Sequence, residues 1–470
     1  MAADGPKPGF LGNINPDQEA KLQKLWSVLL KAAESPSGDE QSNGSAEAPT
    51  SPAQPQRRHS LLSRTQSNIS EKTTASVTRA PYQQKVMAYL KEIGIGAQET
   101  KMVQKALSEI APLELRNGVL NLLKHDNPDA MMLRFLRARK WDVPKAFAMM
   151  MEAIVWRVKE MHVDDDVMAK GELHALQQER NNANVVDKKA GKDFLAQMRM
   201  GKAYVHGTDK LGRPIVVIKV RLHKPGAQSE ETLERYIVHV IESVRLTLSP
   251  PVETAEYPPV KFILKCFEAN YPESLGVLLI HNAPWVFSGI WRIIRGWMDP
   301  DIAAKVNFTN NTNDLAKFIA RDQLVEELGG TEKWKYEYIE PEENENQKME
   351  DTTTRDALTR ERQQIGEEFL EATLDWIEAA NSKDKTKAQA AESQRAYLAE
   401  RLRVNHWKLD PYTRARLCLD RERVIQDGGK IDFYPKAEEF VETKPVELSK
   451  TSEVEHLESV NGSTAQATVA

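Results

Sequence analysis

The stretch between residues 270 and 309 constrains the fold more than any other part of the chain. Residues 277–280 are four consecutive apolar residues, and a polar pair follows them directly. A short apolar block with such borders is typical of a buried strand, usually in a parallel pair. Asn282 can cap a helix, Pro284 suits its first turn, and an extended pattern resumes at Lys305. The stretch therefore predicts a strand, a helix and a second strand in succession.

The predicted helix, residues 285–298, has one apolar side and one polar side, and the polar side carries Arg292 and Arg295. Gly289 and Gly296 each lower the stability of this helix by about 1 kcal/mol and so make it less rigid. Two interpretations stay open. The helix is either a core-facing amphipathic helix or a mobile wall over an apolar cavity, where its tryptophans would suit a membrane–water boundary. The residues of the apolar side are Phe287, Ile290, Trp291, Ile294, Trp297 and Met298.

Length and charge limit the classes of protein to which the chain can belong. Its 470 residues suffice for two or three domains. The 64 basic and 69 acidic residues give a net charge of −5, which argues against a protein that coats nucleic acid. No apolar run reaches the length of about 18 residues that a membrane span needs, and the first residues lack an apolar signal core. With only two cysteines, the sequence predicts a soluble, cytoplasmic protein without a disulfide framework.

The apolar pattern changes along the chain and divides it into segments. A helix is predicted to begin at Asn15, and a stretch rich in Ser, Gly and Pro follows that buries too little apolar surface to order itself. Residues 204–207 and 215–218 have the pattern of strands, and a turn-rich link joins them. This arrangement predicts a β-hairpin. The predicted segments are an N-terminal helix in 1–34, a disordered linker in 35–80, helices in 81–165, an α/β domain in 166–340, helices in 351–435 and a disordered tail in 436–470.

Two basic groups have competing interpretations. Residues 57–59 are basic and precede Ser60, which makes Ser60 a candidate phosphorylation site for a basic-directed kinase, although such strings also arise by chance in polar linkers. A second group could face anionic lipid, but arginines close to acidic residues more often pair with them, and we expect pairing here. This group consists of Arg414, Arg416, Arg421 and Arg423.

The motifs of common enzyme classes are missing. The chain has no GxxxxGK[ST], GxSxG or HExxH string. Gly94 and Gly96 begin like a dinucleotide fingerprint, but Glu99 stands where the third glycine belongs and no predicted strand precedes them. None of the ten histidines has the spacing of a metal-ligand pair. These observations favour binding over catalysis, with no metal and no cofactor.

Six motifs in a fixed order resemble the CRAL-TRIO domain proteins, over about residues 125–340. The segment at 8–13 and the helical tail are similar to fungal members of that family. The resemblance implies a CRAL-TRIO lipid-binding lobe of mixed α/β class: a mostly parallel sheet flanked by helices, with a helical lead-in in 81–165 and a helical C-terminal extension. The motifs are MLRFLRARKWDV at 132–143, Tyr271-Pro272-Glu273, Asn282-Ala283-Pro284, Asp299-Pro300, Lys305 and Leu328-Gly329-Gly330.

The resemblance also implies a function and a site. Fungal members exchange phosphatidylinositol, and some exchange sterol or phosphatidylcholine, between membranes. A diacyl lipid carries roughly 30 methylenes at about 0.8 kcal/mol each, so its carrier needs a large apolar pocket. The implied partners are a phospholipid ligand, a transient membrane surface and a possible protein partner at the C-terminal helices. The implied residues are Arg139, Lys140, Glu273 and Lys305 for the headgroup, Val277 and Leu279 for the pocket strand, and the apolar side of helix 285–298 for the gate.

Simpler explanations of the same residues remain. Arg139 and Lys140 could belong to a solvated helix face, and Glu273 and Lys305 could form a structural ion pair. Residues 249–259 are a further departure, because this link holds four prolines and no apolar run where family members carry a central strand. A lost exon, a splice form or a sheet with fewer strands would each explain the short link. An alternative function is therefore a protein-interaction module whose lipid pocket is degenerate.

Overall fold

The computed structural model describes residues 7–34, 79–248, 269–285, 287, 291–292, 295–296 and 300–435. Several predictions lie outside these residues. They concern the linker with Ser60, the short link at 249–259, the tail after 435, and the gate residues Ile290, Ile294, Trp297 and Met298.

The first helix, α1 (Pro16–Ala33), begins where the sequence predicted. The Asn15 side chain accepts a hydrogen bond from the Gln18 backbone at 2.9 Å, and the Gln18 side chain accepts one from the Asn15 backbone at 3.0 Å. The predicted run of helices across 81–160 is also confirmed. It consists of α2 (Arg79–Glu92), α3 (Ala97–Glu109), α4 (Pro112–Leu123), α5 (Pro128–Ala138) and α6 (Val143–Val155), followed by the π-helical turns η1 (Trp156–Glu160) and η2 (Val163–Met168).

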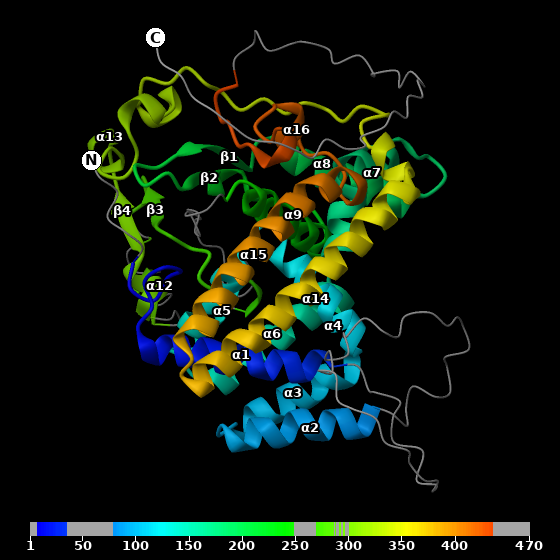
Figure 1. Ribbon diagram of the computed structural model, residues 1–470. Helices are drawn as coiled ribbons and strands as arrows, with labels where there is room; N and C mark the ends of the chain where they lie inside the picture. Colours follow the sequence, from blue (N-terminus) through cyan, green and yellow to red (C-terminus); the bar gives the residue numbers. More distant parts are fainter. Residues whose placement is uncertain are drawn as a thin grey trace, which may run out of the picture. The chain divides into compact units, whose positions relative to one another are not determined.

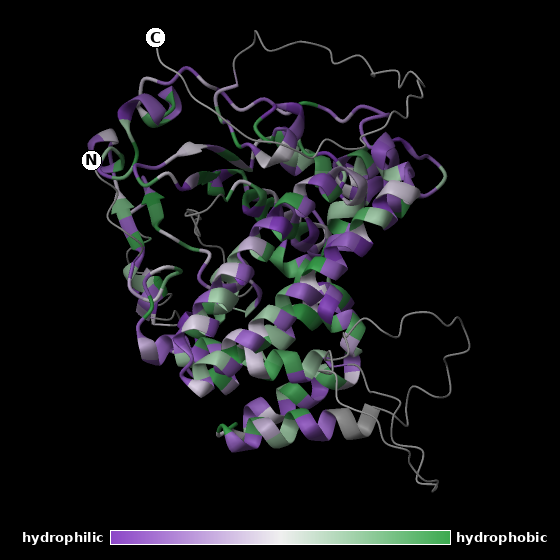
Figure 2. Ribbon diagram, in the orientation of Figure 1, coloured by the Kyte–Doolittle hydropathy of each residue, from purple (hydrophilic) through white to green (hydrophobic). Residues whose placement is uncertain are grey.

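Two long helices near the C-terminus pack on this helical lead-in. Figure 1 shows α14 (Thr352–Ser382) and α15 (Lys385–Thr413) side by side, and both share one apolar core with α1, α5 and α6. Ile365, Phe369 and Trp376 of α14 are buried in that core. Figure 2 shows apolar and polar residues interspersed along both helices.

The predicted β-hairpin is present. Strands β1 (Ala203–Thr208) and β2 (Pro214–Ile218) pair antiparallel, with Tyr204 opposite Val217. Asp209 closes the turn by accepting hydrogen bonds from the backbone of Leu211 and of Arg213, each at 2.9 Å. The helices α7 (Ala169–Arg180), α8 (Val185–Arg199) and α9 (Glu230–Leu246) surround this hairpin and bury a second apolar core.

The strand–helix–strand prediction for 270–309 is confirmed at its ends. Strands β3 (Leu278–His281) and β4 (Val306–Thr309) pair parallel, with Ile280 opposite Phe308, and α12 (Pro300–Ala304) precedes β4. The chain is thus mixed α/β as predicted. Among the described residues, however, the two pairs form separate two-stranded sheets, of which only β3–β4 is parallel.

Short elements complete the fold. Ile215, Leu315, Ile319 and Leu324 form a small third core. None of the described helices combines the length and apolarity that a membrane span requires. The short elements are η3 (Val220–Leu222), α13 (Thr312–Leu315), η4 (Arg321–Gln323), η5 (Glu326–Leu328), η6 (Gln347–Glu350), α16 (Cys418–Arg421) and η7 (Asp427–Gly429).

Candidate functional site

Glu273 and Lys305 lie together although they are far apart in sequence. The Lys305 Nζ is 3.4 Å from the Glu273 Oε2, and the two side chains are 24% and 23% exposed. The β3–β4 pair fixes this approach, because the Lys305 carbonyl accepts a hydrogen bond from the Leu278 backbone at 2.9 Å. The site therefore presents one cation and one anion that water can reach.

The backbone at Glu273 has an unusual conformation. Its φ is +56°, in the left-handed region that a residue with a side chain rarely adopts. This conformation costs roughly 1–2 kcal/mol relative to the right-handed one. The neighbours Tyr271 and Ser274 are buried and hold the turn in place. Strain retained by its surroundings is common at functional positions, which makes this turn a candidate for a binding role.

Arg139 and Lys140 are the other two predicted headgroup residues, and they directly follow the end of α5. The Arg139 guanidinium donates to the Ala138 carbonyl at 3.3 Å and also faces Glu152, whose pKa is raised by burial. Lys140 is exposed, with a φ of +51°. No contact among the described residues joins either of them to Glu273 or Lys305. The structure thus brings together two of the four predicted residues.

Two gate residues contact a strand residue that the sequence analysis did not single out. The ring centroids of Phe287 and Trp291 lie 6.2 Å and 5.5 Å from that of Phe308 on β4. Phe308 is 43% exposed, and Trp285 at the start of this segment is 87% exposed. Val306 and Phe308 are two positions apart, so the alternation of side chains along a strand could have predicted that they share one face.

The two predicted pocket residues are Val277, directly before β3, and Leu279 on β3. Leu278, which the sequence analysis did not choose, is fully buried. Val277 and Leu279 are half-buried, as expected for side chains on the opposite face of the strand. Leu279 packs against the small core that includes Ile215 and Leu315.

A fully buried carboxylate lies behind this site. The Glu242 side chain on α9 contacts Arg157 at 2.8 Å, Lys124 at 3.1 Å and Arg245 at 3.1 Å. It also accepts a hydrogen bond from the Tyr271 hydroxyl at 2.7 Å. Burial alone would raise the pKa of Glu242, but the three cations outweigh burial and hold the pKa well below its usual value.

Comparison with known proteins identifies the family. The family model for the CRAL/TRIO domain matches residues 198–257 and 252–330, and that for the CRAL/TRIO N-terminal domain matches residues 99–152. A CRAL-TRIO domain-containing protein of Schizosaccharomyces pombe is 35% identical over 441 residues, which cover 88% of this chain and 91% of the relative. This chain belongs to the CRAL-TRIO family.

Other CRAL-TRIO relatives carry names that state what they bind or where they act. Phosphatidylinositol transfer protein CSR1 of Eremothecium gossypii is 37% identical over 329 residues, which cover 67% of this chain and 72% of the relative. Sec14 cytosolic factor of Schizosaccharomyces pombe is 26% identical over 234 residues, which cover 43% of this chain and 74% of the relative. The predicted resemblance to fungal CRAL-TRIO proteins is therefore confirmed.

The CRAL-TRIO match is interrupted at the short link. Its two segments overlap at residues 252–257, within the proline-rich stretch whose sequence has no apolar run. The described strands on either side of this link, β2 and β3, belong to different sheets.

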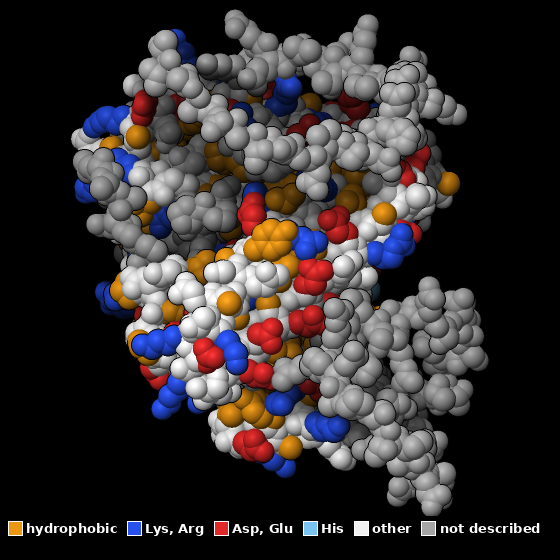
Figure 3. All heavy atoms as spheres, in the orientation of Figure 1, with side chains coloured by type: hydrophobic (Ala, Val, Ile, Leu, Met, Phe, Trp, Pro, Cys, Tyr) orange, Lys and Arg blue, Asp and Glu red, His pale blue; other side chains and the backbone are white. Residues whose placement is uncertain are grey.

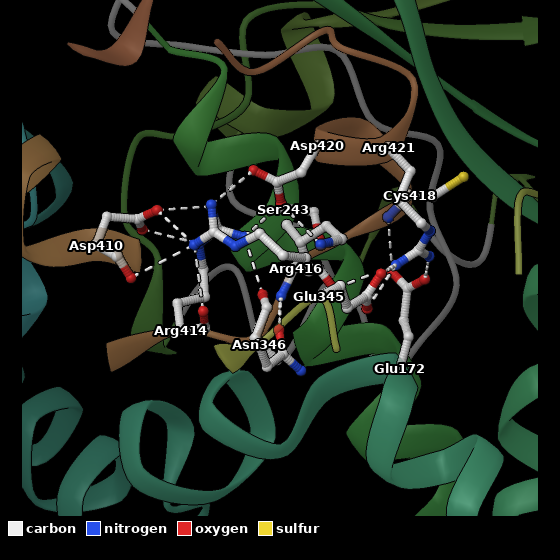
Figure 4. Close-up of polar contacts among 12 residues, drawn as sticks. Glu172, Ser243, Glu345, Asn346, Asp410, Arg414, Arg416, Cys418, Asp420 and Arg421 are labelled. Atoms are coloured by element: carbon white, nitrogen blue, oxygen red, sulfur yellow. Dashed lines mark hydrogen bonds and ion pairs between the residues drawn. The ribbon is translucent and has the colours of Figure 1, made fainter. Parts of the chain in front are cut away.

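Three of the four C-terminal arginines of this CRAL-TRIO protein, Arg414, Arg416 and Arg421, pair with acidic residues as expected. Figure 4 shows Arg414 and Arg416 between the carboxylates of Asp410 and Asp420. The Arg414 guanidinium lies 2.7 Å from each of those carboxylates. Arg421 binds Glu345 at 3.0 Å and also contacts Glu172. These three arginines stabilise the C-terminal region and leave no cationic surface of their own.

Proposed function

We propose that this chain is a non-enzymatic lipid carrier that binds phosphatidylinositol and transfers it between membranes. Sterol or phosphatidylcholine would be further cargo. The approach of Glu273 to Lys305, at 3.4 Å, is the observation that carries the proposal. The names of the relatives support it, since one is a phosphatidylinositol transfer protein identical at 37% of aligned positions.

The chemistry of the pair suits a sugar-phosphate headgroup. An ammonium group donates hydrogen bonds to phosphate oxygens, and a carboxylate accepts them from inositol hydroxyls. Without lipid the two side chains bind each other, and a partly exposed ion pair contributes only about 0–1 kcal/mol. The cost of separating Lys305 from Glu273 is therefore small, and a headgroup can replace each partner. Arg139 and Lys140 would supply further positive charge at the phosphate.

The acyl chains would lie behind the aromatic segment. Phe287 and Trp291 already rest on Phe308, so this segment covers one face of β4. Movement of the segment away from Phe308 would open a path for the lipid. Ile290, Ile294, Trp297 and Met298 would extend the same apolar wall, with Val277 and Leu279 opposite.

Transfer also requires brief contact with a membrane. Trp285 is 87% exposed, and tryptophan is favourable at the membrane–water boundary because its ring is apolar and its N–H is polar. Arg292 and Arg295 are exposed on the same segment and would attract anionic lipid. We propose a cytoplasmic protein that associates peripherally with membranes and holds phospholipid as its ligand.

The test uses the purified full-length chain. Lipids that co-purify with it are identified by mass spectrometry, and vesicle-to-vesicle transfer of phosphatidylinositol is measured with labelled lipid. We expect bound phosphatidylinositol and transfer well above the spontaneous rate. A protein without lipid that also fails to transfer any would contradict the proposal.

The second candidate is an interaction module with a degenerate pocket. The short link at 249–259, which holds four prolines and no apolar run, favours it. In this case α14 and α15 would bind a protein partner. Figure 3 shows charges of both signs interspersed on this face of the protein. Two ion pairs on these helices are Arg401–Glu368 and Arg403–Glu400. A protein that never loads lipid but forms a stable complex through these helices would support the module.

A further inference from the structure

We infer that Tyr271 is a positioning residue for the headgroup site: its hydrogen bond to the buried Glu242 holds the turn that carries Glu273. This inference rests on the proposed function and deepens it, because it identifies the interaction that orients the inositol-binding carboxylate. The Tyr271 hydroxyl donates to the Glu242 Oε1 at 2.7 Å. The two residues are 29 positions apart in sequence, so the bond joins the turn to a separate element, α9.

The Tyr271 ring is fixed on two sides. Its side chain is only 3% exposed. Trp156, the first residue of η1, packs edge-on against the ring, with centroids 5.9 Å apart and planes at 85°. The Arg245 guanidinium lies over the ring at 5.6 Å from its centroid. The ring therefore packs between the helical lead-in and α9, and the hydrogen bond to Glu242 fixes its hydroxyl end.

The acceptor is fixed as firmly as the donor. Glu242 is fully buried and binds cations from three segments: Lys124 at the end of α4, Arg157 after α6, and Arg245 on α9 itself. Arg157 also binds Asp164 at 2.6 Å. Because three cations hold it in a water-excluded space, the Glu242 carboxylate has little freedom to move. Tyr271 thus connects the turn to the most constrained polar group near the site.

The effect on the site follows from sequence proximity. Glu273 stands two residues after Tyr271 and has the left-handed φ of +56°. Such a conformation persists only where its surroundings impose it. Without the hydrogen bond at Tyr271, we expect the turn to relax toward ordinary backbone angles. The Glu273 carboxylate would then leave the position from which it reaches Lys305 and an inositol hydroxyl.

The experiment removes the hydroxyl and keeps the ring. Tyr271→Phe in the full chain retains the contacts with Trp156 and Arg245. The protein is incubated with vesicles that hold phosphatidylinositol and phosphatidylcholine in equal amounts, and the bound lipids are quantified by mass spectrometry. We expect the ratio of bound phosphatidylinositol to phosphatidylcholine to fall about tenfold, because a hydrogen bond to a charged group is involved and phosphocholine has no hydroxyl to offer Glu273.

A matched control comes from the same domain. Tyr338 donates its hydroxyl to another buried carboxylate, Glu172, at 2.9 Å, away from the turn. Tyr338→Phe removes the same kind of bond, and we expect its lipid ratio to stay within about twofold of wild type. Glu242→Gln is a poor test, because it leaves three buried cations short of an anion and can prevent folding.

A second measurement does not depend on lipid. Amide hydrogen exchange of the lipid-free chain is followed over residues 271–278, and we expect faster exchange in Tyr271→Phe than in wild type or Tyr338→Phe. Unchanged exchange in Tyr271→Phe overturns the inference whether or not the protein binds lipid. Wild-type selectivity in Tyr271→Phe also overturns it, as does an equal loss of both lipids. A wild-type chain that loads neither lipid contradicts the proposed function, while faster exchange would still support the anchoring of the turn.

Discussion

Arg395 on α15 donates a hydrogen bond to Asp129 at the start of α5, with 2.6 Å between Nη2 and Oδ1. Trp26 on α1 donates to the same carboxylate oxygen at 2.8 Å. One carboxylate thus joins the first helix of the chain to one of the last, through a helix of the lead-in.

The first prediction concerns the stability that this carboxylate provides. Asp129→Ala leaves the Arg395 guanidinium buried without its anion, and breaking a buried pair in this way typically costs about 3–5 kcal/mol. We expect the free energy of unfolding in urea to fall by about that amount. Glu400→Ala is the control, since it breaks a more exposed pair with Arg403 on the same helix and should cost about 1 kcal/mol or less. Equal effects of the two changes would refute the role of Asp129.

The second prediction addresses the headgroup pair directly. Glu273→Ala or Lys305→Ala should lower phosphatidylinositol loading at least about tenfold, because each removes a charge-assisted hydrogen bond to the headgroup. The unfolding midpoint should change little, because the pair is partly exposed. Lys317→Ala, which breaks the separate pair with Asp314, is the control. Wild-type loading in both variants would exclude Glu273 and Lys305 from the site.

The third prediction tests the contact between the aromatic segment and β4. Phe308→Ala removes the ring on which Phe287 and Trp291 rest, and each aromatic pair is worth about 0.5–1.5 kcal/mol. We expect bound lipid to dissociate up to about tenfold faster, as measured by the release of fluorescent phosphatidylinositol. Tyr397→Ala, which removes an exposed ring from α15, serves as the control. An unchanged release rate would mean that Phe308 does not hold the segment closed.

The fourth prediction is a dependence of stability on pH. Burial lowers the pKa of His125 to about 4, although its 2.6 Å hydrogen bond with the Leu248 carbonyl opposes that shift. The unfolded chain, with a histidine pKa near 6.5, therefore takes up a proton before the folded chain does. Stability should fall as the pH drops from about 6.5 to about 4, with a contribution from His125 of about 3 kcal/mol.

The check compares wild type with His125→Gln in urea denaturation between pH 7 and pH 4. We expect the variant to lose less stability than wild type over this interval, because its side chain has no proton to gain. The exposed residue His162, changed to Gln, is the control and should follow wild type. Parallel curves for wild type and His125→Gln would contradict the assignment.

Local patterns predicted the local elements well. Three elements were predicted from patterns of only a few residues each. The apolar block at 277–280 predicted β3, the turn after Thr208 predicted the hairpin, and the cap at Asn15 predicted α1. The order of the motifs predicted the family in the same way. These features need no knowledge of distant parts of the chain.

The features that were not predicted depend on distant contacts. Periodicity shows that α1 and α14 each have an apolar face but not that these faces meet in one core. Glu242 lies on α9, and nothing in the apolar pattern of that helix indicates Arg157, 85 positions earlier, as its partner. Phe308 was overlooked because a single aromatic residue in a short strand carries no signal until the opposing rings are placed.

The shared core of α1, α5, α6, α14 and α15 has a practical consequence. A fragment cut to the limits of the family match would lack helices that cover α5 and α6. Apolar residues of α5 and α6 would then be exposed to water. Such a fragment would aggregate or bind detergent and membranes nonspecifically. Its apparent lipid affinity would therefore say nothing about the intact carrier.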